Sequence, residues 1–201
     1  DIREALHQGQ FHLAYQPKVN IRINQLQGLE ALLRWNSPTR GNVSPGNFIP
    51  VAEESGHIIP LGYWVLNEVC LTLRSWQDKG LTLVPVSVNV SARQFQQPDF
   101  HKRVAEVLRK HSIDPSLIEI ELTEGLVMED IDSAQRELAQ LKKIGLRISI
   151  DDFGTGYSCL SYLRRFPIDV LKIDKSFVQE IGGSRDGESI IDAIISLAKS
   201  L

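Results

Sequence analysis

Cysteine is scarce in this sequence. The 201 residues include only Cys70 and Cys159, which lie far apart and match no zinc-binding or redox spacing. Two isolated cysteines of this kind are typical of small core or surface residues rather than of a disulfide pair. The cysteine content therefore fits a protein of a reducing compartment.

The sequence also has no long apolar run and no excess of basic residues. No run approaches the ~20 apolar residues that cross a bilayer, and no signal-peptide pattern opens the chain. The 22 lysines and arginines against 25 aspartates and glutamates give a net charge of −3. This balance excludes the electrostatic footprint of a DNA- or RNA-binding surface. We therefore expect a cytoplasmic segment that contacts neither a membrane nor a DNA or RNA polymer.

Strand-like and helix-like patterns alternate along the chain, and 42% apolar residues supply a sizeable core. Predicted strands cover residues 11–19, 27–34, 84–90, 118–123, 146–151 and 170–173, the first two joined by a hairpin-like link around Asn24. One predicted helix begins at Ser44-Pro45, and others cover 58–77, 99–111, 127–141, 157–165 and 186–201. This alternation predicts an α/β fold with parallel strands.

The strand interiors distinguish two α/β architectures. In the strand at 118–123, isoleucine and leucine occupy one face, and Glu119, Glu121 and Thr123 occupy the other. An open doubly wound sheet favours apolar residues on both faces. One apolar face against helices and one polar face against other strands better suits a (β/α) barrel, in which catalytic groups lie at the carboxyl ends of the strands.

The number of predicted strands is too small for a closed barrel. A (β/α)8 barrel has eight strands and typically ~250 residues, whereas six strands are predicted here. Either the chain lacks about two βα units after Leu201, or it is a reduced barrel whose gap a partner fills. Because the chain begins at Asp1 rather than at a methionine, we interpret it as a segment of a longer protein. A membrane-anchored parent is compatible with that interpretation.

Polar side chains recur at the ends of the predicted strands. The set comprises four carboxylates and one amide: Glu30, Asn89, Glu121, Asp151 and Asp152. Carboxylates packed closely raise one another's pKa, and Lys172 offsets only one charge. A divalent cation resolves this conflict, and an oxygen-only set suits Mg²⁺ or Mn²⁺. Zinc is disfavoured because none of the five histidines lies at a strand end.

Oxygen-rich sites with one or two such ions activate water and stabilise charge on phosphoryl oxygens. Arg34 follows Glu30 by four residues, so in a strand both point to the same face, where a guanidinium is suited to hold a phosphate. The residues therefore favour phosphoester hydrolysis. The competing interpretation makes each residue a separate surface or salt-bridge group. Five coincident strand ends argue against it.

Three neighbouring features are interpreted separately. Glu119 is assigned to a structural ion pair, and Asp174 to a cap on the segment that follows the strand at 170–173. The segment at 152–156 reads Asp-Phe-Gly-Thr-Gly. It lacks the spacing of a dinucleotide fingerprint or a P-loop. We interpret it as a mobile active-site loop.

Seven short motifs occur in order between residues 15 and 174 of the chain. They are Tyr15-Gln16-Pro17, Glu30-Ala31-Leu32-Leu33-Arg34-Trp35, Phe48-Ile49-Pro50, Asn89-Val90-Ser91-Ala92-Arg93-Gln94, Glu121-Leu122-Thr123-Glu124, Asp151-Asp152-Phe153-Gly154-Thr155-Gly156-Tyr157-Ser158 and Leu171-Lys172-Ile173-Asp174. In this order they resemble the EAL-domain family of cyclic-di-GMP phosphodiesterases. One small departure is Cys159, where the family usually has serine.

The resemblance implies a modified TIM (β/α)8 barrel with an antiparallel first strand. It implies hydrolysis of cyclic-di-GMP to linear pGpG with two Mg²⁺ or Mn²⁺ ions. It assigns roles to ten residues: Glu30, Asn89, Glu121 and Asp151 as metal ligands, Asp152 as ligand of a second metal, Lys172 as the residue that orients or activates the water, Glu124 as the anchor of the loop at 152–158, Gln16 and Arg34 as substrate contacts, and Leu32 as part of the pocket lining.

The family continues with a seventh strand that carries a Glu-Gly-Val-Glu-Thr motif and an eighth strand with a site glutamine. Residues 1–201 are therefore expected to be a single EAL domain that lacks its last two βα units, and to be inactive or poorly folded alone. Family members are commonly fused to sensory or cyclase domains and often form homodimers.

Two alternatives to the phosphodiesterase stay open at this point. In the first, the chain is a receptor that binds cyclic-di-GMP without cleaving it, but the intact motifs favour the enzyme. An unrelated metal-dependent barrel of the enolase type also mounts carboxylates and lysines on strand ends. The order of the motifs argues against that third possibility.

Overall fold

The computed structural model describes residues 2–155, 163–181 and 185–200. The chain divides into two compact units, Asp1–Ile120 and Glu121–Leu201. The boundary falls inside strand β5 (Ile118–Thr123). Each unit is described by itself. No helix in the described part of the chain is long and apolar enough to cross a membrane.

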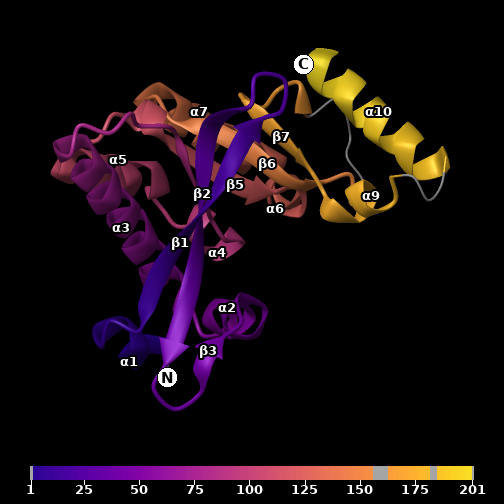
Figure 1. Ribbon diagram of the computed structural model, residues 1–201. Coiled ribbons are helices and arrows are strands. Elements are labelled where there is room, and N and C mark those ends of the chain that lie inside the picture. Colours follow the sequence, from indigo (N-terminus) through magenta and orange to yellow (C-terminus); the bar gives the residue numbers. More distant parts are fainter. Residues whose placement is uncertain (1, 156–162, 182–184, 201) are drawn as a thin grey trace. The chain divides into compact units, whose positions relative to one another are not determined.

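The first unit is organised around a long hairpin of β1 (Phe11–Asn20) and β2 (Gln25–Ser37), which run antiparallel (Figure 1). Asn24 in the connecting turn has a positive φ of 50°, a conformation that asparagine tolerates well. β4 (Val86–Asn89) pairs in parallel with β2, and β3 (Gly41–Val43) pairs antiparallel with it. The order in this unit is β1-β2-β4-β5, which confirms the predicted antiparallel first strand.

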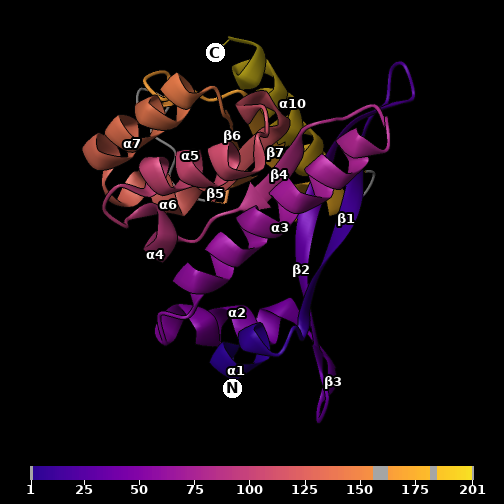
Figure 2. The same cartoon turned by 90° about the vertical axis from the view of Figure 1, so that its left-hand side faces the viewer.

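The helices of the first unit are α1 (Ile2–His7), α2 (Pro45–Glu54), α3 (Ile58–Asp78), α4 (Ala92–Phe95), α5 (Phe100–His111) and the 3₁₀ helix η1 (Pro115–Leu117). Among them, α2 and α3 contact the sheet, and α4 and α5 pack on α3. As predicted, α2 has Ser44 at its N-cap and Pro45 at its first position. α1 and α2 lie at the end of the hairpin that carries β3 (Figure 2).

An aromatic cluster covers one face of the β1–β2 hairpin. The ring of Phe11 lies 5.4 Å from that of Trp35 and 5.7 Å from that of Phe48, and Trp35 meets Phe48 edge-on at 5.6 Å. All three side chains are buried. Because side chains alternate along a strand, this apolar face leaves Glu30, which is an odd number of residues from Trp35, on the opposite face.

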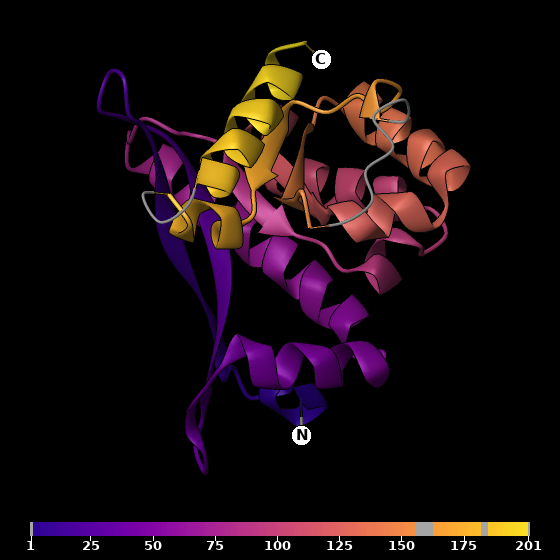
Figure 3. The ribbon, with the colours of Figure 1, turned by 90° about the vertical axis from the view of Figure 1, so that its right-hand side faces the viewer.

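The second unit contains the end of β5, then α6 (Glu124–Glu129), α7 (Ile131–Ile144), β6 (Arg147–Phe153), β7 (Val170–Ile173), α9 (Lys175–Gln179) and α10 (Arg185–Ser200). Its strand order is β5-β6-β7, and β6 and β7 are parallel. α10 packs against α9 and β7 (Figure 3). Gly145 ends α7 with a φ of 103°, a conformation that glycine adopts readily at a helix C-terminus.

The structure differs from the sequence prediction in three respects: the number of strands, one helix that is divided in two, and three helices that were not predicted. It has seven strands in its described part rather than six, because β3 has only three residues and too little pattern to be recognised. The single helix predicted over 127–141 is two helices, since Asp130 ends α6 and its side chain caps α7 through Ser133 N. α1, α4 and α9 were not predicted. Most of the helix predicted at 157–165, with Cys159, lies outside the described residues.

Candidate active site

The first group of predicted site residues lies on the hairpin face opposite the aromatic cluster. Glu30 pairs with Gln16 across the β1–β2 ladder and with Ser87 across the β2–β4 ladder. Two residues after Ser87, Asn89 donates a hydrogen bond from Nδ2 to Glu30 Oε1 over 3.0 Å. The register therefore brings Gln16, Glu30 and Asn89 together, as the motifs predict.

Leu32 and Arg34 continue this face along β2. They pair with Ala14 and His12 of β1, at the same two-residue spacing as Glu30 and Gln16. Both side chains are half-buried, and Arg34 donates from Nη1 to the carbonyl oxygen of Leu33 at 3.0 Å. The face thus runs from a carboxylate through an apolar side chain to a guanidinium.

A second polar cluster occupies the same face, and its members Lys18 and Ser87 were not predicted. Lys18 Nζ donates to Ser87 Oγ and lies 2.7 Å from Glu119 Oε1. Ser87 Oγ donates to the same Glu119 oxygen at 2.7 Å. The structural ion pair predicted for Glu119 is confirmed, and Lys18 is its partner. Lys18 lies near the end of β1, but its two partners are on strands far along the sequence, so no local pattern indicates the contact.

The second group of predicted site residues lies in the second unit. Lys172 Nζ is 2.9 Å from Glu121 Oε2 and 2.6 Å from Asp151 Oδ2. Burial disfavours the charged ammonium, but hydrogen bonds and Coulombic attraction from these two carboxylates outweigh it and raise the pKa of Lys172. Glu121 is only 1% exposed. The three residues form one charged cluster in which Lys172 is an ammonium at neutral pH.

Asp152 follows this cluster in an unusual backbone conformation. Its φ is 54°, which is sparsely populated for a residue with a side chain. Its amide donates to Asp151 Oδ1 at 2.8 Å. The pKa of the Asp152 carboxyl is raised. The largest cause is partial desolvation, and the negative charges of Asp151 and Asp174 contribute less.

Glu124 anchors the segment after Asp152. It is 2% exposed, and its Oε2 accepts a hydrogen bond from the amide of Gly154 at 2.9 Å. Gly154 has a φ of 99°, and a Cβ there would lie 2.9 Å from the ring of Phe177. This contact agrees with the anchoring role that the resemblance implies. Residues 156–158 of the predicted loop lie outside the described residues.

Asp174 has the capping role that the sequence predicts. Its Oδ1 accepts a hydrogen bond from Ser176 N at 2.8 Å at the start of α9. Hydrogen bonds from the side chain and backbone of Ser176 hold the pKa of Asp174 below its usual value. Asp174 is therefore the N-cap residue of α9.

The chemistry of the predicted ligands suits a hard cation. Glu30, Glu121, Asp151 and Asp152 offer carboxylate oxygens, and Asn89 offers an amide oxygen. In residues 2–155, 163–181 and 185–200, no group of three or more His, Cys, Asp or Glu side chains is arranged to hold a metal ion. The metal-ligand set stays a prediction, and its donor atoms fit Mg²⁺ or Mn²⁺.

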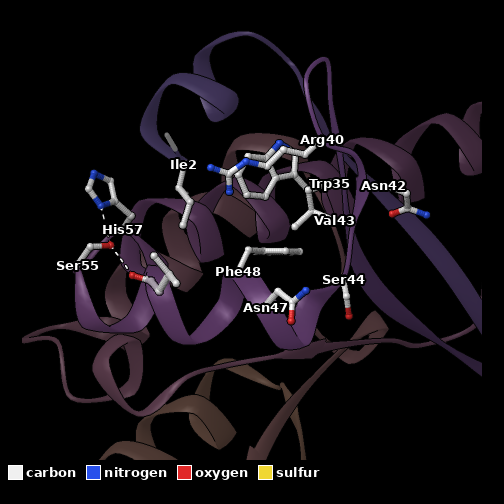
Figure 4. A pocket seen from close by; sticks show the side chains of 11 residues that line it. Ile2, Trp35, Arg40, Asn42, Val43, Ser44, Asn47, Phe48, Ser55 and His57 are labelled. Atoms are coloured by element: carbon white, nitrogen blue, oxygen red, sulfur yellow. Dashed lines mark hydrogen bonds between the residues drawn. The ribbon is translucent and has the colours of Figure 1, made fainter.

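A cavity of about 600 Å³ lies elsewhere in the first unit (Figure 4). Trp35, Phe48, Arg40 and Asn47 line it. His57 Nδ1 is 2.9 Å from Ser55 Oγ at its edge. None of the predicted site residues lines this cavity, so it is separate from the candidate active site.

The family model described as "EAL domain" matches residues 1–201. This chain belongs to the EAL-domain family. The cyclic di-GMP phosphodiesterase PdeR of Escherichia coli is 41% identical over 201 residues, which are 100% of this chain and 30% of that relative. The bifunctional diguanylate cyclase/cyclic di-GMP phosphodiesterase MucR of Pseudomonas aeruginosa is 44% identical, over 100% of this chain and 29% of MucR.

Solved structures agree with this membership. The structure of the Pseudomonas aeruginosa MucR phosphodiesterase, a c-di-GMP complex, has a TM-score of 0.95 at 44% identity and covers 100% of this chain and 81% of that chain. The FimX EAL domain of Xanthomonas citri in complex with c-diGMP has a TM-score of 0.87 at 26% identity and covers 99% of this chain and 77% of that chain. The predicted fold class, the modified TIM barrel of EAL domains with its antiparallel first strand, is confirmed. The chain spans less than a third of the two curated relatives.

Proposed function

We propose that this EAL domain is a metal-dependent phosphodiesterase that hydrolyses cyclic-di-GMP to linear pGpG. The observation that carries the proposal is the Lys172 cluster, in which one ammonium contacts two carboxylates at 2.6 and 2.9 Å. Clusters of coupled charges with shifted pKa values are characteristic of catalytic sites. The phosphodiesterase names of PdeR and MucR support the choice of substrate.

The proposal assigns the cation to the oxygen-bearing residues. Glu30, Asn89, Glu121 and Asp151 would supply oxygen ligands to one Mg²⁺ or Mn²⁺ ion, and Asp152 would serve a second ion. When bound, the cations polarise the phosphoryl oxygen and lower the pKa of a bound water. The carboxylates balance the ionic charge, and the amide of Asn89 adds an oxygen without adding charge.

The remaining residues bind and orient the substrate. Arg34 has a guanidinium that matches the geometry of a phosphate, and Gln16 and Leu32 contact the nucleotide beside it. Lys172 is charged, so it donates hydrogen bonds that orient the attacking water or the phosphate. The water oxygen forms a bond to phosphorus and gives up one proton, the bond from phosphorus to the ribose 3′ oxygen breaks, and that oxygen takes up one proton and leaves as a hydroxyl group. The product carries a terminal 5′-phosphate.

Product analysis tests this proposal. The chain, and any longer protein that contains it, is incubated with cyclic-di-GMP and Mn²⁺ or Mg²⁺, and the nucleotides are separated by chromatography. We expect pGpG to accumulate with the cation and to be absent when the cation is chelated. Unaltered cyclic-di-GMP together with measurable binding would instead identify a receptor that senses the nucleotide without cleaving it.

A further inference from the structure

The Lys18 cluster joins three strands through side chains. Lys18 belongs to β1, Ser87 to β4 and Glu119 to β5, and the three polar groups are mutually hydrogen-bonded. Ser87 is 1% exposed, and the side chain of Glu119 is 5% exposed. Lys18 therefore reaches from β1, the first strand of the sheet, to a buried carboxylate on β5, which is the fourth strand in the order β1-β2-β4-β5.

Stability alone does not account for this cluster. Removing two charges from water costs free energy that their attraction only partly returns, and apolar residues of similar volume are often as stable or more so. The Lys18 side chain is 31% exposed, so its charge is partly solvated, whereas that of Glu119 is not. A buried ion pair at this place calls for a role other than stability.

The backbone is shaped to let Lys18 cross β2. The register shifts between Lys18 and Val19, where β2 has one extra residue, and such bulges re-aim side chains. The residue opposite Lys18 is Gly28. A Cβ on Gly28 would lie 3.7 Å from Lys18 Cε and only 3.1 Å from the carbonyl oxygen of Pro85. The lysine stem thus passes over β2 where that strand carries no side chain.

This crossing lies directly beside the first group of site residues. Gly28 is two residues before Glu30, and Ser87 is the register partner of Glu30. Gln16, which pairs with Glu30 from the other side, is two residues before Lys18. Asn89, which donates to Glu30, is two residues after Ser87. The cluster therefore ties together the two strands that flank Glu30.

We propose that Lys18 is a positioning residue for the Glu30–Asn89 pair. By holding β1 to Ser87 and Glu119 across β2, it fixes the spacing of the strands on both sides of Glu30 and so sets the affinity of this pair for a divalent cation. The inference rests on the proposed function only for the cation, and it does not require turnover. Lys18 itself contacts neither the cation nor the substrate.

A Mn²⁺ titration of the folded protein tests this role. We expect Lys18→Met to raise the dissociation constant for Mn²⁺ roughly tenfold, the size of effect seen when outer-shell partners of metal ligands are removed. Lys18→Arg is expected to restore most of the affinity, because it keeps the charge and the hydrogen bonds. Lys79→Met, at an exposed lysine after α3, is the matched control and should leave the constant unchanged.

A second variant covers the case in which Lys18→Met does not fold. Lys18→Met with Glu119→Gln leaves no unpaired buried charge, so it is expected to fold while still lacking the tie to β1, and to show the same weakened Mn²⁺ binding. An unchanged Mn²⁺ dissociation constant beside a lowered melting temperature would overturn the proposal, as would a wild-type protein that binds no Mn²⁺. A wild type that binds Mn²⁺ with the predicted Lys18 effect but releases no pGpG would contradict the phosphodiesterase proposal alone.

Discussion

Asn89 Nδ2 donates a hydrogen bond to Glu30 Oε1 over 3.0 Å, although the two residues are 59 positions apart in the sequence. The bond uses the amide nitrogen of Asn89, so the amide oxygen is the atom suited to a hard cation. The parallel pairing of β2 with β4 brings the two side chains together. The Glu30 carboxylate and the Asn89 amide group are therefore neighbours.

The first prediction is that removal of the Glu30 carboxylate strongly reduces the rate of hydrolysis. Glu30→Ala deletes a predicted ligand, so we expect kcat/KM for cyclic-di-GMP to fall at least ~100-fold, about 2.7 kcal/mol in transition-state stabilisation. Initial rates of pGpG formation measure this. Glu54→Ala, at an exposed glutamate in α2, is the control and should retain wild-type rates. Full activity of Glu30→Ala would remove Glu30 from the metal-ligand set.

Lys172→Met tests the charge balance of the second cluster. The substitution leaves Glu121, which is buried, and Asp151 without the ammonium that contacts both, so we expect a loss of about 2 kcal/mol in the free energy of unfolding. Because a divalent cation replaces the missing positive charge, added Mn²⁺ should raise the melting temperature of the variant more than that of the wild type. Thermal unfolding with and without Mn²⁺ measures both effects.

The matched control is Lys142→Met. Lys142 pairs with Asp169 at 2.8 Å in the same unit, but both side chains are about 30% exposed, so the expected loss is below ~1 kcal/mol. Its stability should not depend on Mn²⁺. If Lys142→Met and Lys172→Met respond alike to Mn²⁺, the Lys172 carboxylates are not cation ligands.

Gly154→Ala tests the conformation that Glu124 holds. The positive φ of 99° and the 2.9 Å approach of a Cβ to Phe177 predict a loss of about 2 kcal/mol in the free energy of unfolding. Gly125→Ala is the control, since no atom lies within 4 Å of a Cβ at that helical position. It should be neutral or stabilise by up to ~1 kcal/mol. Urea unfolding of both variants compares them, and equal stabilities would contradict the strained geometry.

Cys70 provides a prediction about pH. Burial raises the pKa of its thiol to about 12 from an ordinary value of 9.0. Below pH 9 the thiol is neutral in both states and does not affect the pH dependence of stability. Above pH 9 the unfolded chain ionises first, so its contribution to stability is lost progressively up to about pH 12. In a Cys159→Ser background, the native protein should react with a thiol reagent at pH 8 far more slowly than the unfolded protein. Equal rates would show an accessible thiol.

Much of the fold is predictable from residue patterns. The strand at 118–123 and the Ser44-Pro45 helix start carry strong local signals, and the structure has both. The break at Asp130 was missed because the apolar spacing of α6 and α7 continues across it, so only the cap on Ser133 reveals the break. A three-residue strand such as β3 has no periodicity to recognise.

Some residues of the candidate site are likewise predictable from the sequence, and others are not. Asn89 ends β4 and Lys172 lies one residue before the end of β7, as the strand-end pattern predicts, whereas Glu30 lies inside the longer strand β2 and is identified from its motif. Lys18 has no such signal, because its partners are 69 and 101 residues away and depend on a bulge and on Gly28. Long-range register of this kind is not encoded in a local pattern.

The most direct test of the central claim is hydrolysis in ¹⁸O-labelled water. The protein is incubated with cyclic-di-GMP and Mn²⁺, and the products are analysed by mass spectrometry. The account predicts pGpG with one ¹⁸O atom in its terminal 5′-phosphate, formed only when the cation is present. Bound but unaltered cyclic-di-GMP, or cleavage that continues after the cation is removed, would contradict it.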